Sequence, residues 1–250
     1  MIILYATLIF IFGATLTSFF HLIAYRLPKK MPINGRSKCE SCGQTLRWLD
    51  IVPIFGYLLN KGKCHHCKTK IKSCHLLIEI LGGMSFMIGY LIYGLTLDYI
   101  VLIIFLSVFM IESISDAYYR IVIDRIWIFG ILPLIVIAWI NHVLLVHLLS
   151  ASVLFITLYA IAWIAQKVYK KDAIGGGDIK LYLFVGFLLP LHLGFLSLFI
   201  ASLIGFLYGI IKMRQKNFEI PLVPFIFIGV AISLLYGEVL IQMYLSLFGM

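Results

Sequence analysis

Long apolar runs, each about the length of one membrane-crossing helix, constrain the fold of this 250-residue chain more than any other feature. A helix needs about 20 apolar residues to cross the roughly 30 Å hydrocarbon core of a bilayer, because it rises about 1.5 Å per residue. Charged residues make up only 12% of the chain, whereas a soluble domain has about 25%. The sequence therefore excludes a soluble globular enzyme and a disordered protein, and it predicts an all-α polytopic membrane protein.

The apolar runs predict about eight transmembrane helices. They lie at residues 2–24, 75–94, 99–115, 127–140, 143–166, 181–189, 193–211 and 220–240. Asn141 and His142 form the predicted turn between the fourth and fifth runs, and Pro190 separates the sixth from the seventh. Residues 241–250 are amphipathic and are assigned to no span.

All 20 Lys and Arg residues lie in four of the segments between these runs: 26–74, 116–125, 167–180 and 212–219. The positive-inside rule places such segments in the cytoplasm, so we expect a plasma-membrane protein with its N-terminus outside. This distribution also accounts for the net charge of +9. The basic composition therefore requires no nucleic-acid partner.

Two Cys-x-x-Cys pairs lie in the first basic segment, 21 residues apart, with Gly43 and Gly62 beside them at positions where tight turns favour positive φ. Their residues are Cys39, Cys42, Cys64 and Cys67. This spacing is typical of a zinc ribbon, in which four thiolates hold the ion tetrahedrally and leave no open position for catalysis. Disulfides are the alternative, which a reducing cytoplasm disfavours. We therefore predict a zinc-ribbon-like cytoplasmic loop with structural zinc.

Two aspartates stand out among the acidic residues within or beside the runs, where carboxylates are costly and often functional. Asp116 follows one run and Asp178 precedes another, both at the predicted cytoplasmic face. Two close carboxylates share a proton, so one acts as a base and the other as an acid. Alternatively, both are ordinary helix-boundary residues, since the helix dipole favours Asp at a helix start. The remaining candidates are weaker: Glu79, Asp98, Glu112 and Glu238.

Several short pieces spread over the chain carry a family resemblance. The most specific is Gly175-Gly176-Gly177-Asp178-Ile179-Lys180. The others are Ser18-Phe19, residues 25–28, the two cysteine pairs, residues 50–53, residues 61–64, Glu79, Asp116 and residues 220–225. In these pieces the chain resembles the type IV prepilin peptidases, a family of polytopic aspartyl proteases.

The resemblance implies that Asp116 and Asp178 are the catalytic pair of an endopeptidase, with Gly175, Gly177 and Lys180 in its active-site loop. It implies substrates that are prepilin or pseudopilin precursors, cut after the Gly of a short basic leader at the cytoplasmic membrane face. The apolar runs and the cysteine pairs predict that residues 1–25 form a first transmembrane helix and residues 26–74 a cytoplasmic zinc-binding loop. The resemblance implies that residues 75–250 form the transmembrane aspartyl peptidase domain.

Many members of this family also methylate the new N-terminus with S-adenosylmethionine. Thr17 and His21 stand where the family usually has Gly and Asn, and no residues are assigned to that cofactor. The pattern is most similar to the competence-type branch of Gram-positive bacteria.

Two other function classes remain open on the residues alone. An ion- or proton-coupled transporter also places carboxylates in a membrane, but it predicts them near the midplane, with broken helices in two repeated halves. A membrane scaffold that carries a zinc ribbon needs no aspartate pair. Loss of cleavage on substitution of either Asp116 or Asp178 would distinguish a peptidase from both.

Overall fold

The computed structural model describes residues 1–170, 175–212 and 220–247, which form ten α-helices. Within these residues the only β pairing consists of two isolated bridges. The predicted all-α class is therefore confirmed. The chain divides into two compact units, Met1–Ile111 and Glu112–Met250.

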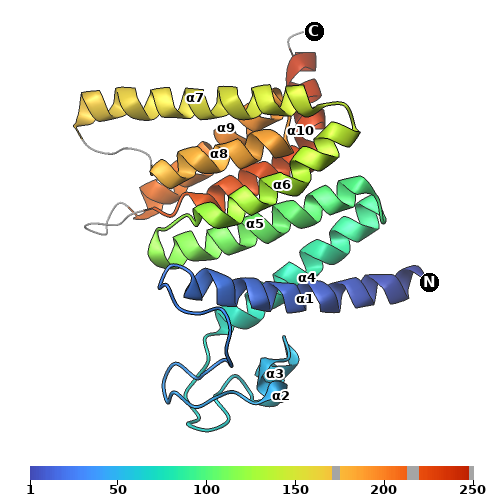
Figure 1. Cartoon of the computed structure of the whole chain (residues 1–250), viewed down its shortest axis with the longest axis vertical. Helices are drawn as coiled ribbons and strands as arrows, with labels where there is room; N and C mark the ends of the chain where they lie inside the picture. The colour runs from blue at the N-terminus through green and yellow to red at the C-terminus, as the bar shows by residue number, and fades with distance from the viewer. Residues whose placement is uncertain (171–174, 213–219, 248–250) are drawn as a thin grey trace. The chain divides into compact units, whose positions relative to one another are not determined.

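The first unit is built on α1 (Ile2–Arg26) and α4 (Ser73–Tyr93), which pack along one another (Figure 1). Their connecting segment holds the cysteines and two short helices, α2 (Trp48–Ile51) and α3 (Phe55–Leu59). The sequence analysis did not predict these two helices, because neither is long enough to show an apolar period. The unit ends within α5 (Leu97–Tyr119).

The second unit contains the end of α5 and five further helices. They are α6 (Asp124–Ile140), α7 (Leu144–Tyr169), α8 (Gly176–Leu188), α9 (Leu191–Lys212) and α10 (Val223–Leu247). Helix α7 packs against α8, and α9 packs against α10. Helix α8 supplies much of the core, since Leu181, Phe184 and Val185 are fully buried.

Among the residues that the structure describes, six helices are long and apolar enough to cross a membrane: α1, α4, α5, α7, α9 and α10. This supports a multi-pass membrane protein. Helices α6 and α8 have 17 and 13 residues, which is short for a full crossing. The count of about eight spans therefore remains a prediction.

The predicted breaks at Asn141-His142 and at Pro190 are confirmed, since they lie between α6 and α7 and between α8 and α9. Several helix ends differ from the predicted spans. Helix α8 begins at Gly176 and not at Leu181, so Asp178 lies inside its first turn. Helix α5 continues to Tyr119, so Asp116 lies inside its last turn. Helix α10 continues to Leu247, through residues that the sequence analysis assigned to no span.

The helix ends that carry the two candidate aspartates lie at one end of the second unit. The end of α5, the corner between α5 and α6, and the starts of α8 and α10 all lie there (Figure 1). Helices that alternate in direction bring every second connection to the same end. This arrangement places Asp116 and Asp178 at one end of the unit.

Candidate active site and metal centre

Asp116 lies in the last turn of α5 and is 6% exposed. Its Oδ2 accepts a hydrogen bond of 3.0 Å from the backbone N–H of Val223, the first residue of α10. The amide of Leu222 also bonds this carboxyl, and the cationic Arg120 is close enough to act on it. A helix N-terminus offers unpaired N–H groups and favours an anion. The start of α10 therefore holds the Asp116 carboxyl in place.

Asp178 lies in the first turn of α8, three residues after the N-cap Gly175. The backbone of Gly175 bonds its carboxyl, and the charge of Asp116 acts on it as well. The structure therefore brings the two predicted catalytic aspartates within electrostatic reach of one another, although they are 62 positions apart in the sequence.

The three glycines before Asp178 differ in the space around them. A Cβ on Gly175 would lie 2.8 Å from Oδ2 of Asp178, and one on Gly177 would lie 2.7 Å from Cβ of Val122. A Cβ on Gly176 would meet nothing within 4 Å. The two glycines assigned to the active-site loop are thus the two where a side chain would collide.

Val122 belongs to the corner between α5 and α6, which contacts the start of α8 in two places. Besides the contact of Val122 with Gly177, Nζ of Lys180 lies 3.0 Å from Oδ2 of Asp124. Both side chains of this ion pair are about half exposed, so it contributes little to stability. Lys180 therefore pairs with an aspartate on α6 that the sequence analysis did not single out.

Glu112 secures the same corner from within the unit. Its side chain is fully buried one turn before Asp116, and its Oε2 accepts a 2.8 Å hydrogen bond from the N–H of Ile123. Its Oε1 has no hydrogen-bond partner among the described residues. The hydroxyl of Ser115 also donates to the carbonyl of Ile121 at 2.7 Å. These two bonds fix the backbone on both sides of Val122.

The four cysteines of the first unit form a separate cluster. The sulfurs of Cys39, Cys42, Cys64 and Cys67 all lie within 4.8 Å of one another, and none of the cysteines forms a disulfide. The sulfurs of Cys39 and Cys67 are 3.8 Å apart. This is about the edge of a tetrahedron with metal–sulfur bonds of about 2.3 Å. The cluster therefore fits a tetrahedral metal ion.

Two similar turns present these sulfurs. In the first, the N–H of Cys39 bonds the carbonyl of Gln44, and in the second the N–H of Cys64 bonds that of Thr69, both at 2.9 Å. Gly43 and Gly62 have φ of +71° and +67°, as predicted. The Thr69 side chain also bonds the Cys67 sulfur, which lowers the pKa of that thiol below its usual range. Thiolates are the form that binds metal.

Comparison with known proteins accounts for nearly the whole chain. Residues 11–93 match the bacterial peptidase A24 N-terminal domain, and residues 100–210 match the type IV leader peptidase family. The chain is 30% identical over 249 residues to the prepilin leader peptidase/N-methyltransferase of Bacillus subtilis, covering 96% of this chain and 98% of that one. The chain belongs to the type IV leader peptidase family.

Two other leader peptidases also match more than nine-tenths of the chain. The prepilin leader peptidase/N-methyltransferase of Vibrio cholerae is 30% identical over 247 residues, which cover 91% of this chain and 95% of that protein. The protein of the same name from Pseudomonas aeruginosa is 26% identical over 273 residues, covering 95% and 92%. No solved structure matches the chain. Membership confirms the resemblance drawn from the motifs and supports the peptidase interpretation over a transporter or a scaffold.

Some contacts that hold the two aspartates were not predicted from the sequence of this chain. Residues 220–225 were noted in the sequence without a role, whereas the structure shows that the Val223 amide binds Asp116. Glu112 was a weak candidate, and nothing in the sequence pointed to Val122. The one available signal in the sequence was the position of Glu112, because an acid inside an apolar run needs a partner.

Proposed function

We propose that this leader peptidase is an aspartyl endopeptidase that cuts prepilin or pseudopilin precursors after the Gly of a basic leader, with Asp116 and Asp178 as its catalytic pair. The observation that carries the proposal is the approach of these two carboxyls at one end of the second unit, each held by backbone amides. The names of the relatives support the class of substrate.

The surroundings of the two aspartates suggest a division of roles. N–H donors and the cationic Arg120 surround Asp116, whereas Asp178 faces the like charge of Asp116. We assign Asp116 as the carboxylate that takes a proton from water, and Asp178 as the acid that holds the shared proton against the scissile carbonyl. The hydroxide attacks the carbonyl carbon while the carbonyl oxygen takes the proton of Asp178, which gives a gem-diol. As the C–N bond breaks, Asp116 gives the proton that it took from water to the leaving amine, and a hydroxyl of the gem-diol returns a proton to Asp178.

The position of the pair suits a substrate with an apolar helix. A leader that remains outside the bilayer and a helix that lies among the membrane-spanning helices would bring the bond between them to the end of α5 and the start of α8. Gly175 and Gly177 let the backbone approach the Asp178 carboxyl and the corner at Val122 closely. Because the bond would be cut at the membrane boundary, the charged leader would not have to enter the lipid.

The cysteine cluster is proposed to hold a structural zinc ion within the loop of residues 26–74, while residues 75–250 carry the peptidase chemistry. Four sulfurs with tetrahedral spacing suit zinc and leave no coordination position for substrate. Zinc would link two turns that are separated by α2 and α3 in the sequence. Its role would be to fold the loop, which has few buried apolar side chains of its own.

The proposed localisation is the plasma membrane, with the N-terminus outside and both the zinc loop and the aspartates on the cytoplasmic side. All 20 cations lie in the four segments that this orientation places inside. Fusion reporters at Lys61 should therefore report the cytoplasm, and reporters at Asn141 the opposite side. A substrate among the pseudopilins of a DNA-uptake apparatus follows the competence-type resemblance.

A single assay tests the cleavage. The purified protein in detergent is incubated with a precursor that carries a basic leader, a Gly and an apolar helix, and the products are weighed by mass spectrometry. We expect one cut directly after the Gly. The relatives' names also describe an N-methyltransferase. If this chain shares that activity, S-adenosylmethionine would supply the methyl group, and its addition should raise the mass of the new N-terminus. Absence of a cut by folded, zinc-loaded protein would contradict the peptidase proposal.

A further inference from the structure

The connecting segment of the first unit exposes apolar side chains although it lies outside the membrane-spanning helices. On α2 and α3, Trp48 is 72% exposed, Phe55 61%, Leu58 56% and Leu59 66%. Helices α2 and α3 contact one another, and large apolar side chains exposed on one such element outside a core mark an interaction surface. We call these four residues the α2–α3 apolar surface.

Polar contacts hold α2 and α3 firmly in place. Asp50 forms a 3.0 Å ion pair with Arg47 and accepts a 2.9 Å hydrogen bond from Asn60. The hydrogen bonds from Arg47 lower the pKa of Asp50 to about 2, so it stays ionised near neutral pH. The N–H of Ile54, between the two helices, donates to Glu79 of α4 at 2.8 Å. The α2–α3 apolar surface is therefore held in place by a hydrogen bond to α4, which is a candidate membrane span.

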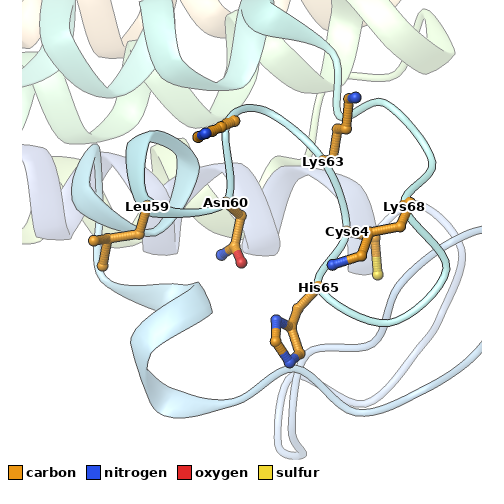
Figure 2. A pocket seen from close by; sticks show the side chains of 7 residues that line it. Leu59, Asn60, Lys63, Cys64, His65 and Lys68 are labelled. Carbon is orange, nitrogen blue, oxygen red and sulfur yellow. The ribbon is translucent and has the colours of Figure 1, made fainter.

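A basic hollow adjoins this surface. Leu59, at the end of α3, lines it together with Asn60, Cys64, His65 and three lysines, Lys61, Lys63 and Lys68 (Figure 2). Their charges favour an anionic partner and disfavour a basic leader peptide. The combination of Trp, Phe and Leu with a lysine border is typical of elements that lie in the headgroup region of a bilayer.

The course of the chain places a bilayer within reach. The segment that holds α2 and α3, residues 27–72, joins the end of α1 at Arg26 to the start of α4 at Ser73. Both helices are candidate membrane spans, so both ends of the segment lie at a membrane boundary. We infer that the α2–α3 apolar surface inserts into the headgroup region of the membrane, with Lys61, Lys63 and Lys68 binding the phosphates of anionic phospholipids.

The environment of Trp48 tests this inference in the full-length protein. Trp127, Trp139 and Trp163 are changed to Phe, and the protein is reconstituted in vesicles of phosphatidylcholine alone or mixed with phosphatidylglycerol. Brominated lipids should quench Trp48 emission in the mixed vesicles, and aqueous acrylamide should quench it weakly. A variant that keeps only Trp163, which is half exposed on the membrane-spanning α7, serves as the positive control for lipid contact.

A second set of variants tests the anionic headgroups. Changing Lys61, Lys63 and Lys68 together to Gln should lower quenching by brominated lipid in the mixed vesicles to its level in phosphatidylcholine alone. Zinc content confirms that each variant is folded. Strong acrylamide quenching of Trp48, or protection from both quenchers as under a protein partner, would overturn the inference. Equal lipid quenching in the two kinds of vesicle would overturn the role of the lysines.

Discussion

Substitution of Gly177 by Ala should test whether cleavage depends on the position of the Asp178 carboxyl, because the substitution displaces this carboxyl without removing it. The added Cβ would lie 2.7 Å from Cβ and 2.9 Å from Cγ2 of Val122, whereas carbon atoms pack at about 3.5–4.0 Å. One side must therefore move by about 1 Å. Val122 cannot yield easily, because Glu112 and Ser115 hold the backbone on either side of it. The start of α8 should move instead and carry Asp178 with it.

The expected cost can be stated for stability and for rate. Overpacking of this kind costs about 1–3 kcal/mol, which a folded membrane protein should tolerate. A displacement of about 1 Å at a reacting group lowers the rate by about 10²-fold. We therefore expect kcat/KM for leader cleavage to fall about 10²-fold, with zinc content and behaviour in detergent unchanged.

The neighbouring glycine provides a matched control. A Cβ on Gly176 would meet no atom within 4 Å, so Gly176→Ala should retain activity and gain a little helix propensity. Val122→Gly in the Gly177→Ala background removes the collision and should restore part of the lost rate. The assay is cleavage of a precursor followed by mass spectrometry. Equal activity of Gly177→Ala and Gly176→Ala would refute the argument from the corner at Val122.

Three further outcomes are expected. Cys64→Ser should release the bound metal, measured as zinc per chain, and expose residues 26–74 to protease; two disulfides in anaerobically purified protein would contradict this. Glu112→Gln keeps an acceptor for the Ile123 amide and should retain most cleavage activity, whereas Glu112→Leu leaves that amide unpaired and should lower kcat more than it changes KM. Lys180→Met removes an exposed ion pair and should lower kcat/KM by less than about tenfold; a larger loss would assign Lys180 a direct role.

The features that could be predicted from the sequence are those that a local pattern encodes. The spacing of the cysteine pairs predicted the cluster, because each Cys-x-x-Cys turn presents two sulfurs and two such turns in contact supply all four. Apolar runs predicted the long helices, and Pro190 predicted the break between α8 and α9. Single aspartates at the ends of apolar runs drew attention to Asp116 and Asp178, since carboxylates there are costly.

The features that were missed depend on contacts between distant backbone groups. The amide of Val223 binds Asp116 across 107 positions, and any residue other than proline carries such an amide. A side chain at position 177 would collide with Val122, and no pattern of residue spacing in the sequence predicts where Val122 lies relative to Gly177. Helices α2 and α3 have four and five residues, too few to show a helical period. The short α8 likewise leaves the number of complete spans open.

Replacement of each aspartate by asparagine tests the central claim most directly. Asp116→Asn and Asp178→Asn keep the shape of the side chain but remove one acid each, so cleavage of the precursor should be abolished in both. The double variant should be no worse than either single one, because the two carboxyls act as a unit. Zinc content and monodisperse behaviour in detergent must match the unchanged protein. Substantial cleavage after the Gly by either folded single variant would contradict the catalytic pair.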